Sequence, residues 1–157
     1  MKRNLLVCAV LLLALAAAGC GGKKAEDTSA TAPPPAAAPG TDTVPADLDA
    51  GPRAGESPTD EALAVQGEGL FKTKGCTACH AFGTRVSGPD LNGVAMRRTA
   101  RWMEWQILHP DLMVKQDPIA RSLFATYALQ MPKQGLTPDQ ARSVIEFLKK
   151  KSKEAGK

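Results

Sequence analysis

The stretch Cys76-Thr77-Ala78-Cys79-His80 is the most informative part of this chain of 157 residues. Two cysteines separated by two residues, with a histidine directly after the second, form the attachment signature of c-type haem. The spacing suits that chemistry, because two thiols one helical turn apart can add across the two vinyl groups of a porphyrin. The adjacent histidine would then lie beneath the iron as an axial ligand, a role that imidazole fills in many haem proteins.

Two other interpretations of this motif depend on its surroundings. A thioredoxin-like redox pair requires a βαβ context, and a zinc site requires a second pair of ligands. From residue 59 onward the sequence shows neither a second ligand pair nor a sustained two-residue alternation rich in β-branched residues. Helical patterns punctuated by glycine and proline dominate instead. The surroundings therefore favour haem attachment and an all-α fold.

Helix-start signals divide the part after residue 58 into several short helices. The last start is the clearest, with Thr137 as N-cap, Pro138 at the first helical position and Gln140 as the capping-box partner. Earlier starts are predicted at Thr59, near Thr99 and at Asp117. The few large apolar residues of so small a domain would form only a marginal core on their own. A bound group such as haem is therefore expected at its centre.

Over residues 59–151 the chain resembles the class I cytochromes c. The stretch Gly67-Glu68-Gly69-Leu70-Phe71 is similar to their N-terminal helix, in which a glycine and an aromatic residue pack against the C-terminal helix. Phe147 and Leu148 are the expected partners on that last helix. The resemblance implies an all-α class I cytochrome c fold of about four to five helices around one covalently bound haem c.

The resemblance also implies roles for individual residues around the haem. Cys76 and Cys79 would hold it, and His80 would be the proximal iron ligand. The stretch Gly88-Pro89-Asp90-Leu91 follows the motif as it does in that family, where the proline carbonyl accepts a hydrogen bond from the proximal histidine. This role carries over to Pro89. Such a bond fixes the histidine tautomer and raises its basicity as a ligand.

Met131 is predicted to be the second axial ligand. In the resembling family the ligand methionine lies in a loop shortly before the C-terminal helix and is often followed by proline. Met131 precedes Pro132 and stands six residues before Thr137. A loop methionine can approach the iron, whereas a helical one is committed to packing. The rival candidates, interpreted as core, surface or capping residues, are Met96, Met103, Met113 and His109.

Several other residues stay open between a haem contact and an ordinary structural role. Trp102 and Trp105 share one helix face. They either line the haem edge, with an indole N–H on a propionate, or pack in the core. Three arginines could pair with propionates, although a solvated helix face is expected for at least two of them: Arg97, Arg98 and Arg101.

The first 58 residues differ in composition from the rest and predict export and tethering. Residues 1–19 fit a signal peptide, because Lys2 and Arg3 precede an uncharged apolar run too short to span a bilayer comfortably. The sequence Ala17-Ala18-Gly19-Cys20 resembles the lipobox of bacterial lipoproteins, which implies a lipid on Cys20. A retained membrane anchor and cleavage by a general signal peptidase are the alternatives. Only Cys76 and Cys79 then remain in the folded part, so no structural disulfide is predicted.

The middle of the chain is predicted to be a linker. Residues 20–58 are rich in proline and alanine and nearly free of large apolar residues, a composition typical of disordered segments. The cytochrome domain is expected over residues 59–157. That part carries 15 Lys and Arg against 10 Asp and Glu, a net charge of +5. Such a charge either steers association with acidic redox-partner proteins or is a solvated surface.

These features predict an electron carrier rather than an enzyme. With His80 and Met131 both bound to iron, no position stays open for a substrate. The expected role is a membrane-tethered shuttle or relay of a respiratory chain, on the periplasmic or cell-surface side, with no nucleic acid as a partner. The alternatives are a haem domain acting as a ligand-binding sensor or catalytic subunit, and a fixed subunit of a terminal oxidase or denitrification reductase.

Overall fold

The computed structural model describes residues 42–156, and every regular element among them is a helix. The α-helices are α1 Glu61–Thr73, α2 Val94–Arg97, α3 Ala100–Leu108, α4 Pro110–Gln116, α5 Pro118–Tyr127 and α6 Pro138–Ala155. Short 3-10 turns cover Ala54–Glu56 (η1) and Cys76–Ala78 (η2). The all-α prediction is confirmed. The described part holds six α-helices, above the four to five expected, because α2 has only four residues and a single residue divides α4 from α5.

The predicted helix starts agree with the structure at three positions out of four. The side chains of Thr99, Asp117 and Thr137 each accept a hydrogen bond from the backbone N–H three residues later. Thr137 also forms the predicted capping box with Gln140. The prediction of Thr59 is wrong by one residue, because the N-cap of α1 is Asp60. A carboxylate at that position satisfies a free N–H and interacts favourably with the helix dipole.

Helices α1 and α6 cross in close contact, and a glycine makes the crossing possible. A Cβ atom at Gly67 would collide with the backbone of Ser143 and Val144 on α6. One turn further along α1, the Phe71 ring lies 5.4 Å from that of Phe147, which confirms the expected partner. Phe82 completes an aromatic cluster, at 5.6 Å from both rings. The two terminal helices are thus locked together beside the Cys76–His80 segment.

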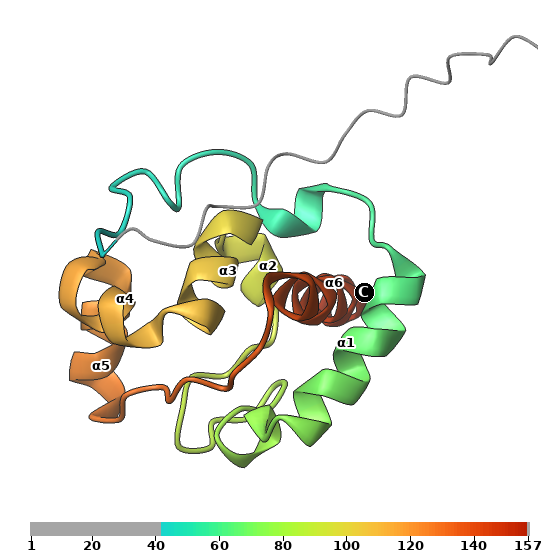
Figure 1. The fold of residues 1–157 in the computed structure, drawn as a ribbon. Helices are drawn as coiled ribbons and strands as arrows, with labels where there is room; N and C mark the ends of the chain where they lie inside the picture. Colours follow the sequence, from blue (N-terminus) through green and yellow to red (C-terminus); the bar gives the residue numbers. More distant parts are fainter. Residues whose placement is uncertain (1–41, 157) are drawn as a thin grey trace, which may run out of the picture. The chain divides into compact units, whose positions relative to one another are not determined.

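The remaining helices lie on the other side of α6. Figure 1 shows α2 and α3 next to α6, with α4 and α5 stacked beyond them. Trp102, Met103 and Trp105 form the buried face of α3, which confirms that the two tryptophans share one face. Met113 of α4 is fully buried. Within the part of the chain that the structure describes, no helix is long and apolar enough to span a bilayer.

Residues 42–58, here called the N-terminal strap, correct the linker prediction. They run across α2 and α3 as a packed segment, drawn in cyan in Figure 1. Leu48 keeps only 1% of its surface exposed, and Val44 and Ala54 are also buried in the core cluster. The Thr99 hydroxyl donates to the Leu48 carbonyl at 2.6 Å. The low apolar content of residues 20–58 misled the prediction, because a few anchors with specific hydrogen bonds are enough to order the strap.

The other predictions for the N-terminal part concern residues 1–41. The signal peptide over residues 1–19 and the lipid on Cys20 lie outside the described residues, as do residues 20–41 of the predicted linker.

Candidate haem site

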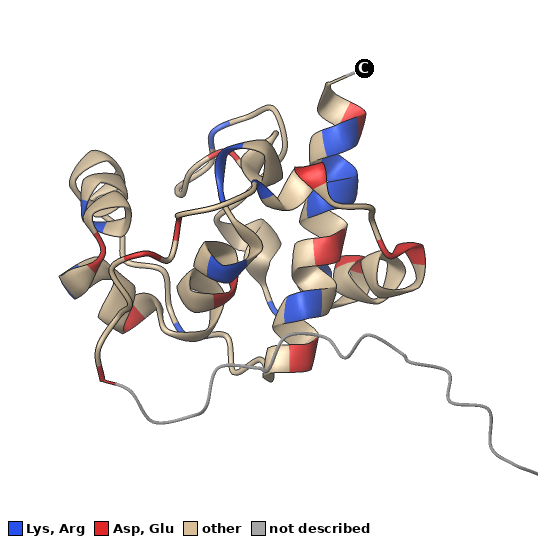
Figure 2. Cartoon of the chain, turned by 90° about the horizontal axis from the view of Figure 1, so that it is seen from above, with Lys and Arg blue, Asp and Glu red and all other residues tan. Residues whose placement is uncertain are grey.

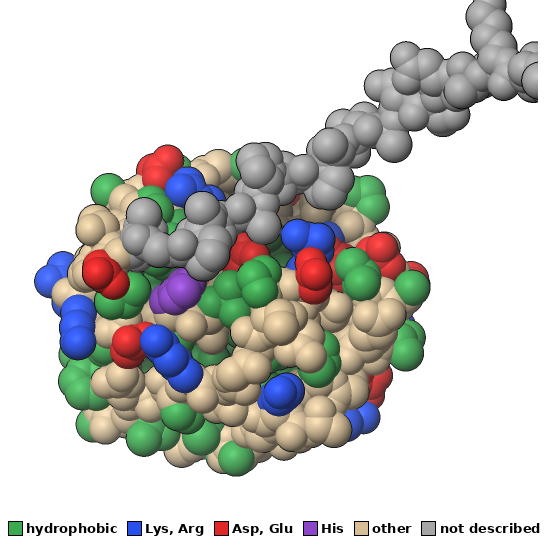
Figure 3. Space-filling model, in the orientation of Figure 1, with side chains coloured by type: hydrophobic (Ala, Val, Ile, Leu, Met, Phe, Trp, Pro, Cys, Tyr) green, Lys and Arg blue, Asp and Glu red, His purple; other side chains and the backbone are tan. Residues whose placement is uncertain are grey.

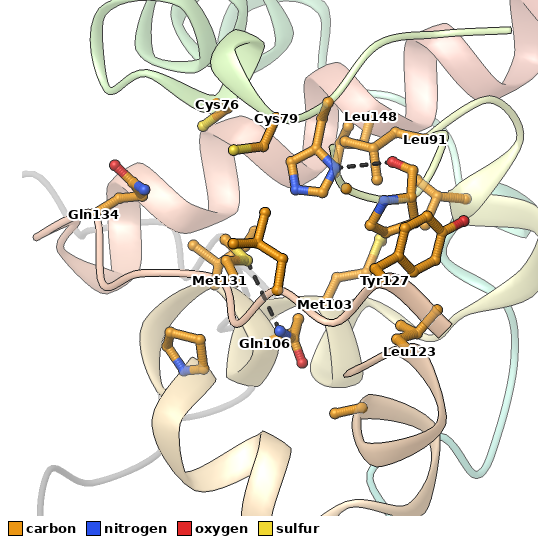
Figure 4. A pocket seen from close by; sticks show the side chains of 18 of the residues that line it. Cys76, Cys79, Leu91, Met103, Gln106, Leu123, Tyr127, Met131, Gln134 and Leu148 are labelled. Atoms are coloured by element: carbon orange, nitrogen blue, oxygen red, sulfur yellow. Dashed lines mark hydrogen bonds between the residues drawn. The ribbon is translucent and has the colours of Figure 1, made fainter. Parts of the chain in front are cut away.

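One large cavity brings the predicted site residues together. It is lined by residues from all six α-helices and by the loops around residues 75–91 and 129–134. Its empty volume is about 1400 Å³, counting the open space at its mouth. Most of the lining is apolar, with Leu91, Leu123 and Leu148 among the large contributors (Figure 4). A mostly apolar hollow into which a few polar side chains converge suits a large planar cofactor.

Both cysteines of the motif face this cavity. Figure 4 shows Cys76 and Cys79 close together at its rim, and both are free thiols. They lie on and after the 3-10 turn η2, whose N-cap is Gly75 with a φ of 77°. A positive φ of this kind favours glycine and lets the chain turn sharply out of α1. Burial raises the pKa of the Cys76 thiol, which therefore stays protonated at neutral pH.

His80 also lines the cavity, and a hydrogen bond to the backbone fixes the orientation of its ring. Its Nδ1 atom lies 2.9 Å from the carbonyl oxygen of Pro89. Because a carbonyl can only accept, this contact places the proton on Nδ1 and leaves Nε2 as the free basic nitrogen. Gly88 allows the close approach, since a Cβ atom there would come within 2.9 Å of the His80 ring. The histidine is thus fixed in the tautomer that an iron ligand requires.

Met131 lies across the cavity from the cysteines, in the loop between α5 and α6 (Figure 4). The Gln106 side chain donates from Nε2 to the Met131 sulfur at 3.8 Å. The other amide atom, Gln106 Oε1, is buried and has no hydrogen-bond partner among the described residues. No sequence signal identifies Gln106. Its role comes from a contact between α3 and the Met131 loop, which lies 25 residues later in the chain.

The rival ligands lie elsewhere or in the packed core. His109 joins α3 to α4, and its ring packs on Trp105 at a centroid distance of 4.9 Å, outside the cavity lining. Met96 is half exposed, and Met113 is buried away from the cavity. Met103 does line the cavity, but from the middle of α3, where its buried side chain belongs to the core cluster.

The open questions about the tryptophans and arginines receive different answers. Trp102 lines the cavity, but its indole N–H donates to Asp117 Oδ1 at 3.2 Å and is therefore already satisfied. Trp105 packs in the core and does not line the cavity. Arg97 and Arg98 both line the cavity. Arg101 does not, and it forms an exposed ion pair with Asp47 of the strap instead.

The residues present fit a covalently attached haem c. The cavity offers two free thiols for thioether bonds, a histidine of fixed tautomer and a thioether sulfur on the far wall. Arg97 and Arg98 supply cations in the same lining for the carboxylates of such a group. Phe124 and Leu129, also in the lining, remain 44% and 46% exposed, so the cavity reaches the surface.

Comparison with known proteins gives a consistent result. Residues 64–152 match the Cytochrome c family. The cytochrome c-551 of Stutzerimonas stutzeri is 53% identical over 36 residues, a stretch that covers 23% of this chain and 35% of that relative.

Solved structures extend the likeness over most of the described domain. A cytochrome c from Rhodothermus marinus has a TM-score of 0.59 and 34% identity, covering 65% of this chain and 96% of its own. An engineered form of cytochrome c from the same organism has a TM-score of 0.59 and 35% identity, over 62% and 84% of the two chains. The chain therefore belongs to the cytochrome c family, as a class I c-type cytochrome that carries covalently bound haem c.

Proposed function

We propose that this protein is a single-haem electron carrier in which His80 and Met131 are the two axial ligands of the iron. Membership of the cytochrome c family already indicates haem-based electron transfer. The single observation that supports the ligand pair is the placement of His80 and Met131 in one cavity together with both cysteines. When bound, the haem supplies an iron that gains and loses one electron, at a potential that a methionine ligand raises.

The chain's own residues would then hold the cofactor rather than perform chemistry. Cys76 and Cys79 anchor it covalently, and Pro89 keeps His80 oriented. His80 and Met131 would both bind the iron, and no coordination position would then remain for oxygen, peroxide or a substrate. The apolar lining excludes water from most of the cofactor, which lowers the cost of rearranging solvent when an electron moves.

A partner protein would meet this carrier at the mouth of the cavity. Phe124 and Leu129 are exposed there and suit a small apolar contact of the kind that transient redox complexes use. None of the lysines at the end of α6 lines the cavity, and three of them are paired with carboxylates. Lys149 is buried against Glu146, while Lys150 and Lys151 are paired with Glu61 and Glu154. Figure 2 shows acidic positions in red between the basic ones in blue along the C-terminal helix.

The ion pairs at the end of α6 thus offset part of the positive charge of the domain. On the face shown in Figure 3, basic side chains alternate with acidic and apolar ones. A mixed surface favours brief encounters with redox proteins of the periplasm or membrane over one tight complex.

Optical spectra of the haem-loaded protein test the ligand pair. The oxidised wild type should show the weak near-infrared band of sulfur-to-iron charge transfer, and Met131→Ala should lose it. The reduced wild type should not react with carbon monoxide, whereas the reduced variant should bind it. Ready binding of carbon monoxide by the wild type would contradict the proposal and favour a ligand-binding sensor or a catalytic haem domain.

We further propose that the carrier is exported and tethered to a membrane by a lipid on Cys20. The support is the sequence of residues 1–20, and the tether would lead directly into the strap. A labelled fatty acid should be incorporated by the wild type and not by Cys20→Ser, and the variant should be released from membranes. Equal release of both proteins would contradict the lipid tether.

A fixed subunit of a terminal oxidase or denitrification reductase is the alternative within electron transfer. Purification of the haem-loaded protein from solubilised membranes separates the two roles. A free shuttle should be recovered alone, while a stable stoichiometric complex would contradict the shuttle.

A further inference from the structure

The N-terminal strap lies outside residues 64–152, yet it is tied to the segment that carries two cavity-lining arginines. That segment is the junction between α2 and α3, at residues 97–99. The Ala54 N–H of the strap donates to the Arg98 carbonyl at 2.9 Å. The Arg53 guanidinium donates to the Arg97 carbonyl at 3.0 Å. The strap therefore fixes the backbone from which both arginines extend.

One strap residue reaches an arginine side chain directly. The Asp49 carboxylate accepts from the guanidinium of Arg98 at 3.3 Å and is paired with Arg53 at 3.0 Å. Its Oδ1 atom also accepts the Thr99 N–H at 2.9 Å. The Asp49 side chain is only 18% exposed, so water screens these contacts less than it screens a surface pair.

The Arg98 guanidinium is bounded on several sides. It lies 5.2 Å from the centre of the Trp102 ring, and it donates to the Arg97 carbonyl at 3.1 Å. Both Arg98 and Trp102 line the haem cavity. Asp49 thus supplies the anion that neutralises a cavity-lining cation and limits the directions in which it can extend.

We propose that Asp49 is a positioning residue for the haem site, which acts through Arg98 and thereby sets part of the reduction potential. The strap would be a component of the electron-transfer unit rather than a passive connection to the membrane. Two physical effects support this role. Charges near the cavity shift the balance between oxidised and reduced iron. In addition, Arg98 would be free to turn toward the carboxylates of the cofactor if Asp49 no longer paired with it. This inference needs haem in the cavity but does not depend on Met131 as a ligand.

A double-mutant cycle on the haem-loaded protein tests the proposal, with the reduction potential as the readout. Asp49→Asn should raise the potential, because the variant loses an anion and leaves the Arg98 charge unopposed. Arg98→Gln should lower the potential, because it removes the cation. In the Arg98→Gln background, the shift caused by Asp49→Asn should fall to less than half of its size in the wild type. An unchanged potential in Asp49→Asn, or an equal shift in both backgrounds, would overturn the proposal.

Two control variants separate this effect from charge and from stability. Asp47→Asn removes another strap carboxylate, whose partner Arg101 does not line the cavity, and it should leave the potential unchanged. A shift equal to that of Asp49→Asn would show a general charge effect and would also overturn the proposal. Leu48→Ala should lower the melting temperature and leave the potential near that of the wild type, because it removes packing but no charge.

Discussion

Two largely irregular segments are connected to the haem site, and they are held in contrasting ways. The Met131 loop lines the cavity itself, whereas the strap contacts the α2–α3 junction, from which Arg97 and Arg98 reach the cavity. The strap is tied to the α2–α3 junction by backbone and side-chain hydrogen bonds and by the buried Leu48. In the Met131 loop, residues 129–136 make no backbone-to-backbone hydrogen bond with another described residue. Two polar side-chain contacts reach this loop from outside, from Gln106 to Met131 and from Asp111 to Lys133, and Leu136 packs partly buried against the core.

The difference indicates which segment depends on the cofactor. The strap has enough contacts of its own to be ordered whether or not haem is bound. A loop with so few polar contacts would gain much of its order from the proposed bond between Met131 and iron. Because such a bond would be reversible, a loosely held loop would also affect how easily Met131 dissociates from the iron.

The largest expected effect comes from the strap. Leu48→Ala removes a side chain that is 99% buried and should lower the free energy of unfolding by about 2–5 kcal/mol. Chemical denaturation of the haem-loaded protein measures this loss. Val65→Ala, at a 65% exposed position of α1, is a matched control that should change stability by less than about 0.5 kcal/mol. Equal stability of the two variants would show that the strap is not part of the folded unit.

The next effect concerns the ligand loop. Gln106→Leu keeps the approximate side-chain volume and removes the hydrogen bond to the Met131 sulfur. The loss of about 0.5–1.5 kcal/mol should make imidazole bind to the oxidised protein roughly 2- to 10-fold faster, because Met131 dissociates more often. Stopped-flow mixing measures the rate. The strap variant Leu48→Ala serves as the comparison. If imidazole binding were accelerated more in Leu48→Ala than in Gln106→Leu, the strap rather than the loop contact would control the dissociation of Met131, which would contradict this account.

A smaller effect is expected at the outer contact of the loop. The Lys133 ammonium beside Asp111 lowers the pKa of that carboxyl, at an ion-pair distance of 3.1 Å. Both side chains are exposed by more than a third, so the pair contributes little and is screened by salt. Asp111→Asn should accelerate imidazole binding less than Gln106→Leu does. The acceleration should disappear in about 1 M salt, and persistence there would contradict an electrostatic contact.

The smallest effect probes α3, the helix that supports both segments. Burial raises the pKa of Glu104, and the nearby Arg142 and His109 side chains only partly oppose this shift. Since the folded protein binds the Glu104 proton more tightly than the unfolded chain, stability from this group is gained as the pH falls. Glu104→Gln should therefore be slightly more stable than the wild type at pH 7, and the two should become equal below about pH 4. Greater stability of the wild type at pH 7 would contradict this account.

The sequence predicted the features that depend on local signals. Thr99, Asp117 and Thr137 carry the N-cap chemistry that begins a helix, and each one does so. The residues predicted for the haem site all line one cavity. Three of them belong to the Cys76–His80 motif, and the resemblance to the family identified Pro89 and Met131. The chemistry of cofactor attachment therefore leaves a clear trace in the sequence.

Features that depend on distant contacts could not be predicted. The order of the strap depends on Leu48 and Asp49 meeting Thr99 about fifty residues later, and composition alone masked it. Gln106 has no signal of its own, because its importance comes from the path of the loop beside α3. Trp102 was left open between two roles; it both lines the cavity and packs in the core, and the position of Asp117 decides only the partner of its indole N–H.

The identity of the sixth iron ligand is the most direct test of the account. X-ray absorption at the iron edge of the oxidised, haem-loaded protein reports the elements bound to the metal. The account predicts five nitrogen ligands and one sulfur ligand, and the loss of that sulfur in Met131→Ala. A first shell of nitrogen and oxygen atoms alone in the wild type would contradict it, and Met131 would then be a residue of the cavity wall rather than a ligand.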